Sequence, residues 1–198
     1  MRNIRCIFTR KNLSKAIMNK TNTELKRNGN TQILKIAIVV GVVVLFMLGS
    51  YLLKEEALSE GDEAPVWNLP LVNEGEGMLS LSSFRGKIAL VDFWSTTCPP
   101  CLSQITVLLR IQHQFPELAV VGVEVGGEAL DRLRDFTKLR NILYPVVSDT
   151  RGIAAKAYSV SSLPTLFIVG PDGTILASHE GFWPEEPLTA QIREVMKK

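Results

Sequence analysis

Two cysteines lie a few residues after a strongly apolar segment near the middle of this chain. Residues 88–94 read Ile-Ala-Leu-Val-Asp-Phe-Trp, a nearly continuous apolar run that is typical of a strand buried on both faces. After a three-residue turn come Cys98-Pro99-Pro100-Cys101, and the apolar spacing that follows predicts a helix at about Pro99 to Phe115. We therefore expect the cysteine pair at the junction between a central strand and a helix.

This position predicts redox chemistry for the pair. The positive end of the helix dipole stabilises a thiolate at Cys98, which is the expected nucleophile, and Cys101 lies one turn away as the resolving thiol. A structural disulfide rarely spans two residues, and a zinc site would need two more ligands, for which only His113 and His179 are present. The sequence therefore predicts a redox-active Cys98–Cys101 disulfide, with no further cofactor and no metal.

Apolar runs of strand length alternate with helical patterns over residues 61–198, which favours an α/β fold with a mixed central sheet and flanking helices. The Gly170–Gly173 turn predicts that the last two strands form an antiparallel hairpin. Further strands are expected at Leu118–Val125, Tyr144–Val147, Thr165–Val169 and Thr174–Ser178, and further helices at about Glu128–Arg140, Thr150–Tyr158 and Leu188–Met196.

The beginning of the chain predicts a membrane anchor. Residues 1–35 carry nine Lys or Arg against a single acid, Glu24, and 18 residues without a charge follow at 36–53. That length matches the hydrocarbon core of a bilayer, and the positive-inside rule keeps the basic arm in the cytoplasm. We expect a cytoplasmic arm (1–35), a transmembrane helix (36–53), a tether (54–60) and an extracytoplasmic domain (61–198).

Other interpretations of this region remain open. A cleaved signal peptide also begins with a basic region, although its apolar centre is usually shorter, about 7 to 15 residues. Met18 could be the true start of the protein. The basic arm lacks interleaved aromatic residues, so we expect no nucleic-acid partner, and Cys6 is expected to be an ordinary reduced thiol.

Several motifs follow one another along residues 61–198. They are Gly61-Asp62-Glu63-Ala64-Pro65, Leu81-Ser82-Ser83-Phe84-Arg85-Gly86-Lys87, Val91-Asp92-Phe93-Trp94, the CPPC motif, Leu163-Pro164-Thr165, Pro171-Asp172-Gly173 and Gly181. With these motifs the domain resembles the membrane-anchored, thioredoxin-like proteins of the TlpA/ResA type, in the AhpC/TSA and redoxin superfamily. The resemblance implies a thioredoxin-like fold with a βα insertion at residues 117–141, and thiol-disulfide oxidoreductase activity outside the cytoplasm.

The resemblance also implies roles for individual residues. Pro164 matches the cis-proline that packs beside the cysteine pair, and Leu163, Pro99 and Pro100 are expected on the substrate-binding surface. Asp92 lies in an apolar strand, where burial should raise its pKa. It matches a buried aspartate that implies a proton acceptor for the resolving thiol, while a purely structural carboxyl is the alternative. Glu124 is a weaker candidate for the same work.

Three residues depart from the pattern of this family. Thr97 stands where tryptophan is usual, Gln104 where many members have glutamate, and Thr106 where a proline is common. These departures affect the expected partner surface and proton route but leave the thiol chemistry intact.

Three functions are open to such a chain. The first is a reductase of oxidised extracytoplasmic proteins, which a membrane electron donor would return to the dithiol form. The process that the family resemblance implies for it is cytochrome c maturation. The second is a thiol peroxidase, although Val91 occupies the position of a required proline. The third is a copper chaperone, for which the cysteine spacing is one residue short. The first is the favoured hypothesis.

Overall fold

The computed structural model describes residues 35–36, 38–49, 58–73, 75 and 77–197. The chain divides into two units, residues 1–55 and 56–198. In the first unit, residues 35–36 and 38–49 are helical, and their large apolar side chains are exposed. Among the described residues, no helix combines the length and the apolar character that crossing a bilayer requires. Most of the predicted arm and tether, and parts of the predicted span, lie outside the described residues.

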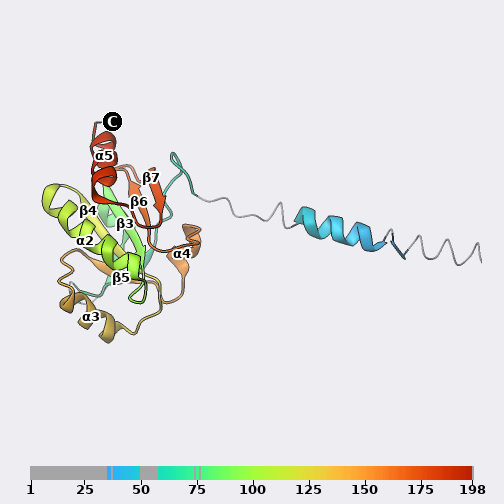
Figure 1. Ribbon diagram of the computed structural model, residues 1–198, viewed down its shortest axis with the longest axis horizontal. Coiled ribbons are helices and arrows are strands. Elements are labelled where there is room, and N and C mark those ends of the chain that lie inside the picture. The colour runs from blue at the N-terminus through green and yellow to red at the C-terminus, as the bar shows by residue number, and fades with distance from the viewer. Residues whose placement is uncertain (1–34, 37, 50–57, 74, 76, 198) are drawn as a thin grey trace, which may run out of the picture. The chain divides into compact units, whose positions relative to one another are not determined.

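Five strands form one mixed sheet in the second unit, in the order β5-β4-β3-β6-β7 (Figure 1). The central strand β3 is parallel to β4 and antiparallel to β6, and β6 and β7 form an antiparallel hairpin. This confirms the predicted mixed sheet, its central strand and its hairpin. The strands are β3 (Ala89–Trp94), β4 (Ala119–Glu124), β5 (Val146–Ser148), β6 (Thr165–Val169) and β7 (Ile175–Glu180).

Helices cover both faces of this sheet, and each face has its own hydrophobic core. On one face, α2 (Pro99–Gln114), α3 (Leu130–Leu139) and α5 (Glu185–Val195) pack with Leu90 and Trp94 of β3. On the other face, α4 (Ile153–Ala157) and the 3₁₀ turn η1 (Leu81–Phe84) pack with Val91 and Phe93. Because side chains alternate along a strand, Asp92 faces the side of the sheet that α2 covers.

Two differences from the sequence prediction have local causes. Helix α4 begins at Ile153, not at about Thr150, because Gly152 has a left-handed backbone conformation (φ 65°) that interrupts a helix. Helix α5 begins at Glu185, three residues before the predicted start, and the acidic residues Glu185 and Glu186 in its first turn suit the positive end of the helix dipole.

A small hairpin precedes the main sheet and was not predicted. It consists of the antiparallel strands β1 (Asn68–Pro70) and β2 (Met78–Ser80), each three residues long. Strands this short give no usable alternation of apolar and polar residues in the sequence. The hairpin reaches the main sheet through an isolated bridge between Leu71 and Val147 of β5.

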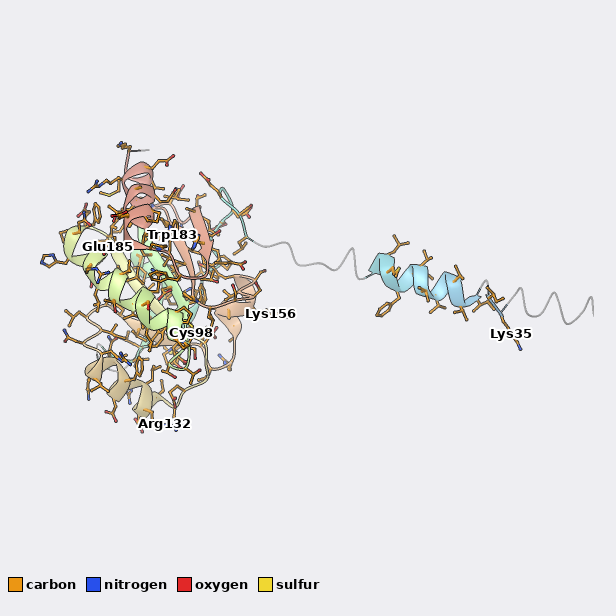
Figure 2. All side chains as sticks on the ribbon, viewed as in Figure 1. Lys35, Cys98, Arg132, Lys156, Trp183 and Glu185 are labelled. Atoms are coloured by element: carbon orange, nitrogen blue, oxygen red, sulfur yellow. A yellow bond between two sulfur atoms is a disulfide. The ribbon has the colours of Figure 1, made fainter. Side chains whose placement is uncertain are left out.

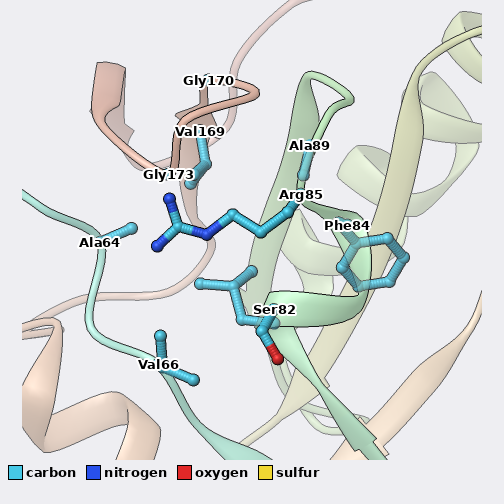
Figure 3. Close-up of a pocket in the computed structure, with 10 residues that line it drawn as sticks. Ala64, Val66, Ser82, Phe84, Arg85, Ala89, Val169, Gly170 and Gly173 are labelled. Carbon is cyan, nitrogen blue, oxygen red and sulfur yellow. The ribbon is translucent and has the colours of Figure 1, made fainter.

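A small pocket lies between the start of the domain, η1 and the turn that joins β6 to β7 (Figure 3). Ala64 and Val66 line one side of it, and the side chain of Arg85 extends across it toward Gly173. Gly173 has a positive φ (85°), which favours glycine, and a Cβ there would also meet the Arg85 guanidinium. Arg85 also pairs with Glu63 at 3.5 Å. These contacts attach the first residues of the domain to its last hairpin.

Candidate active site

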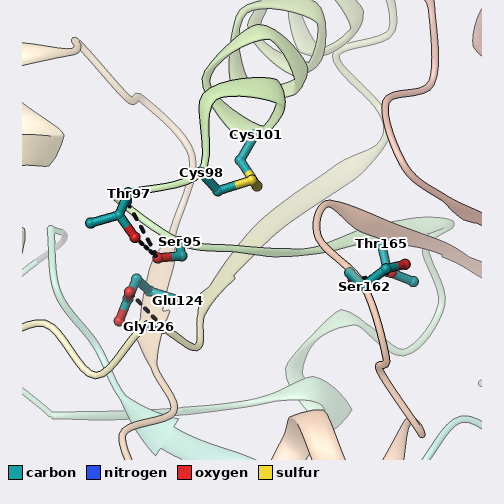
Figure 4. The surroundings of a disulfide bond; sticks show 8 residues. All are labelled: Ser95, Thr97, Cys98, Cys101, Glu124, Gly126, Ser162 and Thr165. Atoms are coloured by element: carbon teal, nitrogen blue, oxygen red, sulfur yellow. Dashed lines mark hydrogen bonds between the residues drawn. A yellow bond between two sulfur atoms is a disulfide. The ribbon is translucent and has the colours of Figure 1, made fainter.

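Cys98 and Cys101 form a disulfide at the N-terminus of α2 (Figure 4). The S–S bond is 2.06 Å long, and the two Cα atoms are 5.3 Å apart. Cys98 is the N-cap residue, and Pro99 and Pro100 fill the first helical positions, where a backbone N–H would have no partner in the helix. The pair therefore lies at the predicted junction between the central strand and α2.

The two sulfur-bearing residues differ in exposure. Cys101 is completely buried and belongs to the core between α2 and the sheet, whereas Cys98 is half-buried at its edge. Pro99 and Pro100 are exposed beside it. A partner can therefore reach Cys98 but not Cys101, which fits the predicted roles of nucleophile and resolving thiol.

The turn before Cys98 is held by polar contacts (Figure 4). The hydroxyls of Ser95 and Thr97 are 3.2 Å apart, and the Thr97 N–H donates to Ser95 Oγ at 3.4 Å. The loop after β4 packs closely against this turn, because a Cβ on Gly126 would collide with Ser95 Oγ and lie 2.6 Å from Glu124 Oε1. Thr97 thus contributes a hydroxyl to this turn.

Glu124 is buried at the end of β4. Its Oε1 accepts a hydrogen bond from the Gly126 N–H at 2.8 Å, while its Oε2 has no partner among the described residues. Burial raises the pKa of Glu124, and the backbone N–H groups of the following loop oppose that rise. Glu124 therefore holds a carboxyl close to the turn that carries Cys98.

Asp92 is completely buried in β3, and neither of its carboxyl oxygens has a hydrogen-bond partner among the described residues. Desolvation raises the pKa of Asp92 to about 8. This confirms the expectation that burial in an apolar strand perturbs this carboxyl. At neutral pH the side chain is largely protonated and neutral.

Two aromatic residues that the sequence analysis did not single out lie near Asp92. They are Trp94 and Tyr144. Gly122 is paired with Asp92 across the sheet, and a Cβ on Gly122 would lie 2.7 Å from Trp94 Nε1 and 3.3 Å from the Tyr144 ring. Burial, together with the charge of an ionised Asp92, raises the pKa of Tyr144. Neither the Trp94 N–H nor the Tyr144 hydroxyl has a partner among the described residues. No spacing pattern in the sequence reveals this cluster, because it depends on strand register.

The Leu163–Pro164 peptide bond is cis, as the resemblance predicted. Pro164 is buried and Leu163 half-buried, and Leu163 contacts both hydrophobic cores. The Pro164 carbonyl accepts from the Gly181 N–H at 2.7 Å, and the Thr165 hydroxyl donates to the Ser162 carbonyl at 2.7 Å. These bonds fix the entry to β6, the strand beside β3.

Gln104 joins α2 to the segment before α5. Its Oε1 accepts a hydrogen bond from the Trp183 N–H at 2.7 Å, and the Trp183 ring packs against His179 at a centroid distance of 4.7 Å, with the two rings tilted by 32°. This long-range contact could not be recognised in the sequence. Among the described residues, no group of three or more His, Cys, Asp or Glu is placed to hold a metal ion.

The AhpC/TSA family model matches residues 61–178, which include the disulfide, Asp92 and Pro164. The chain belongs to the AhpC/TSA family. Within this family, the thiol-disulfide oxidoreductase ResA of Bacillus thuringiensis subsp. konkukian is 28% identical over 169 residues, covering 84% of this chain and 94% of that protein. ResA of Bacillus subtilis is 33% identical over 123 residues, covering 62% and 68%.

The solved structure of a similar protein supports the fold. A putative thiol:disulfide interchange protein DsbE from Chlorobium tepidum superposes with a TM-score of 0.65 at 28% identity, covering 71% of this chain and 99% of that one. The main sheet and its helices are therefore a thioredoxin-like fold. Together with the Cys98–Cys101 disulfide, these relatives identify this member of the AhpC/TSA family as a thiol-disulfide oxidoreductase.

Proposed function

We propose that this chain reduces disulfides of extracytoplasmic proteins and is anchored to the membrane by residues 36–53. The observation that carries the proposal is the asymmetric disulfide, with Cys98 accessible and Cys101 buried behind it at the N-terminus of α2. Pro99, Pro100 and Leu163 provide the surface around Cys98 on which a client would dock.

The proposed reaction begins with the reduced dithiol. The Cys98 thiolate attacks one sulfur of the client disulfide, and the other client sulfur leaves as a thiolate. The Cys101 thiolate then attacks Cys98 and releases the second client thiol. The client gains two electrons and two protons, and this chain is left with the disulfide seen here.

Asp92 is the proposed proton acceptor for the second step. Cys101 must lose its proton before it attacks, and it is buried away from solvent. A carboxyl with a pKa of about 8 is close to the ordinary thiol pKa of about 8.5, so it can take this proton and later return it. Glu124, with its raised pKa and its place beside the Cys98 turn, is a second group for such transfer.

The direction of electron flow follows from how the thiolate is supported. Pro99 and Pro100 contribute no N–H and no charge, so support for a Cys98 thiolate is moderate. Where the pH exceeds the Asp92 pKa of about 8, the ionised carboxylate would disfavour this thiolate further. A dithiol with limited thiolate stabilisation is a reductant, and it needs a membrane electron donor to recharge it from the cytoplasm.

The anchor rests on the sequence and on the exposed apolar helix. The nine basic residues of the arm precede 18 uncharged residues, and residues 38–49 within this stretch are helical with exposed apolar side chains. A single pass would place the arm in the cytoplasm and residues 61–198 outside it. The client class that the family resemblance implies is apocytochrome c.

Trapping of mixed disulfides tests the proposal. The Cys101→Ala variant should accumulate covalent adducts with client proteins, because nothing remains to attack Cys98. The Cys98→Ala variant is the matched control and should form none. Adducts that form through Cys101 in place of Cys98 would reverse the assigned roles, and the absence of any adduct in either variant would contradict the client class.

A further inference from the structure

We propose that Gln104 donates a hydrogen bond from Nε2 to the sulfur of Cys101 once the disulfide is reduced, and thereby favours the dithiol form. This inference rests on the proposed function of the pair as a redox centre. Gln104 acts here as a positioning residue for Cys101. Figure 2 shows Cys98 at the start of α2 and Trp183 in the segment before α5, the two regions that Gln104 connects.

The orientation of the Gln104 amide is fixed by its partner. The Trp183 backbone N–H can only donate, so the atom that it meets at 2.7 Å must be the amide oxygen. Turning the amide over would place two donors against each other. The Trp183 ring is itself packed against the ring of His179. The amide nitrogen of Gln104 must therefore point away from Trp183.

That nitrogen is a buried donor without an acceptor. Gln104 is completely buried, and its Nε2 makes no hydrogen bond to any described residue in the disulfide form. A buried donor left unpaired costs free energy. Any acceptor that appears close to it on reduction would remove this cost.

Cys101 provides such an acceptor. It precedes Gln104 by three positions in α2, and side chains at this spacing are neighbours on one face of a helix. Cys101 is also completely buried in the core beneath α2. In the disulfide its sulfur is bonded to Cys98, whereas reduction frees it, and its thiolate form accepts hydrogen bonds better than a disulfide sulfur does.

The consequence is a preference for the reduced state. Exchange with glutathione converts the disulfide and two reduced glutathione molecules into the dithiol and one oxidised glutathione, so two electrons and two protons enter the pair. The Gln104 bond exists only on the dithiol side, and the unpaired N–H exists only on the disulfide side. Both effects shift the equilibrium toward the dithiol. They oppose an ionised Asp92, which disfavours the reduced pair, and they make the disulfide easier for an electron donor to reduce.

Equilibration of the full-length protein in detergent against glutathione at pH 9 tests this inference. Gln104→Met lacks the amide. Gln104→Glu keeps an oxygen for the Trp183 N–H, but when ionised it offers no donor to sulfur and also repels a thiolate at Cys101. Both variants should favour the disulfide about tenfold more than the wild type, which corresponds to about 30 mV. Ser103→Ala, an exposed position on the same helix, is the matched control and should equal the wild type.

The outcomes separate this inference from its alternatives. If Gln104 only fastens Trp183, both redox states lose that contact equally in Gln104→Met. This variant will then equilibrate within twofold of the wild type, which would overturn the inference. If the amide acts on Asp92, its effect will vanish in an Asp92→Asn background, which would also overturn it. A wild-type protein that does not exchange with glutathione at all would refute the proposed function itself.

Discussion

Asp92 and Gly122 are direct partners across the parallel ladder of β3 and β4. Glycine has no side chain, and the partner of Asp92 on β6 is Leu166, so neither neighbouring strand offers the carboxyl a cation or a side-chain donor. Burial is therefore unopposed and raises the pKa of Asp92 to about 8. The carboxyl titrates in the range where thiols titrate.

The pH dependence of stability should change when this carboxyl is removed. The folded-state pKa of Asp92 lies above its unfolded value, so its favourable contribution is full below about pH 4 and is lost as the pH rises to about 8. Asp92→Asn should flatten this decline and gain stability relative to the wild type at pH 8. Urea unfolding of the oxidised wild type and variant at several pH values gives the free energy of unfolding as a function of pH. Parallel pH curves for the two proteins would contradict the assigned pKa.

The same substitution should affect the reactive thiol. An ionised Asp92 repels a nearby thiolate, so Asp92→Asn should lower the pKa of the Cys98 thiol and shift the potential of the pair upward. Thiolate absorbance of the reduced proteins, followed as a function of pH, measures the change. An unchanged titration would leave Asp92 with a structural role alone.

Close packing beside the Cys98 turn makes a separate prediction. Gly126→Ala would place a methyl group against Ser95 Oγ and 2.6 Å from Glu124 Oε1. The forced shift should destabilise the fold by about 1–3 kcal/mol and slow exchange at Cys98. Denaturant midpoints and initial rates of reduction check both effects. A variant with the wild-type midpoint would show that the loop moves away at no cost.

Much of the fold follows from local sequence patterns. The apolar run shows where β3 ends, and the two prolines show where α2 begins. The cysteine pair could therefore be placed at the junction between them. The short strands β1 and β2 carry no such signal. The starts of α4 and α5 depended on the backbone conformation at Gly152 and on the acidic residues after Pro184.

The electrostatic surroundings of the site were less predictable. The burial of Asp92 could be predicted from its apolar neighbours in sequence. That its neighbour on β4 supplies no cation depends on the strand register, which places Asp92 beside Gly122. The bond between Gln104 and Trp183 joins residues 79 positions apart. Such contacts are set by the packing of α2 and α5 on the sheet, which no single segment encodes.

The proposed topology predicts how the protein responds to protease. In intact spheroplasts, added protease should degrade residues 61–198 and leave the basic arm protected, because the arm lies behind the membrane. Antibodies against a tag at each end of the chain show whether the C-terminal domain is digested and whether the N-terminal arm survives. Protection of the C-terminal domain in spheroplasts, with digestion only after lysis, would contradict an extracytoplasmic domain.

The reduction potential of the Cys98–Cys101 pair tests the central claim most directly. Equilibration of the full-length protein against glutathione, with the dithiol fraction read by thiol alkylation and mass spectrometry, gives this potential. A reductase should lie between about −200 and −270 mV, the range of glutaredoxins and thioredoxin. A value near that of a strong oxidant, about −120 mV, would show that the pair accepts electrons from its clients and would contradict the account.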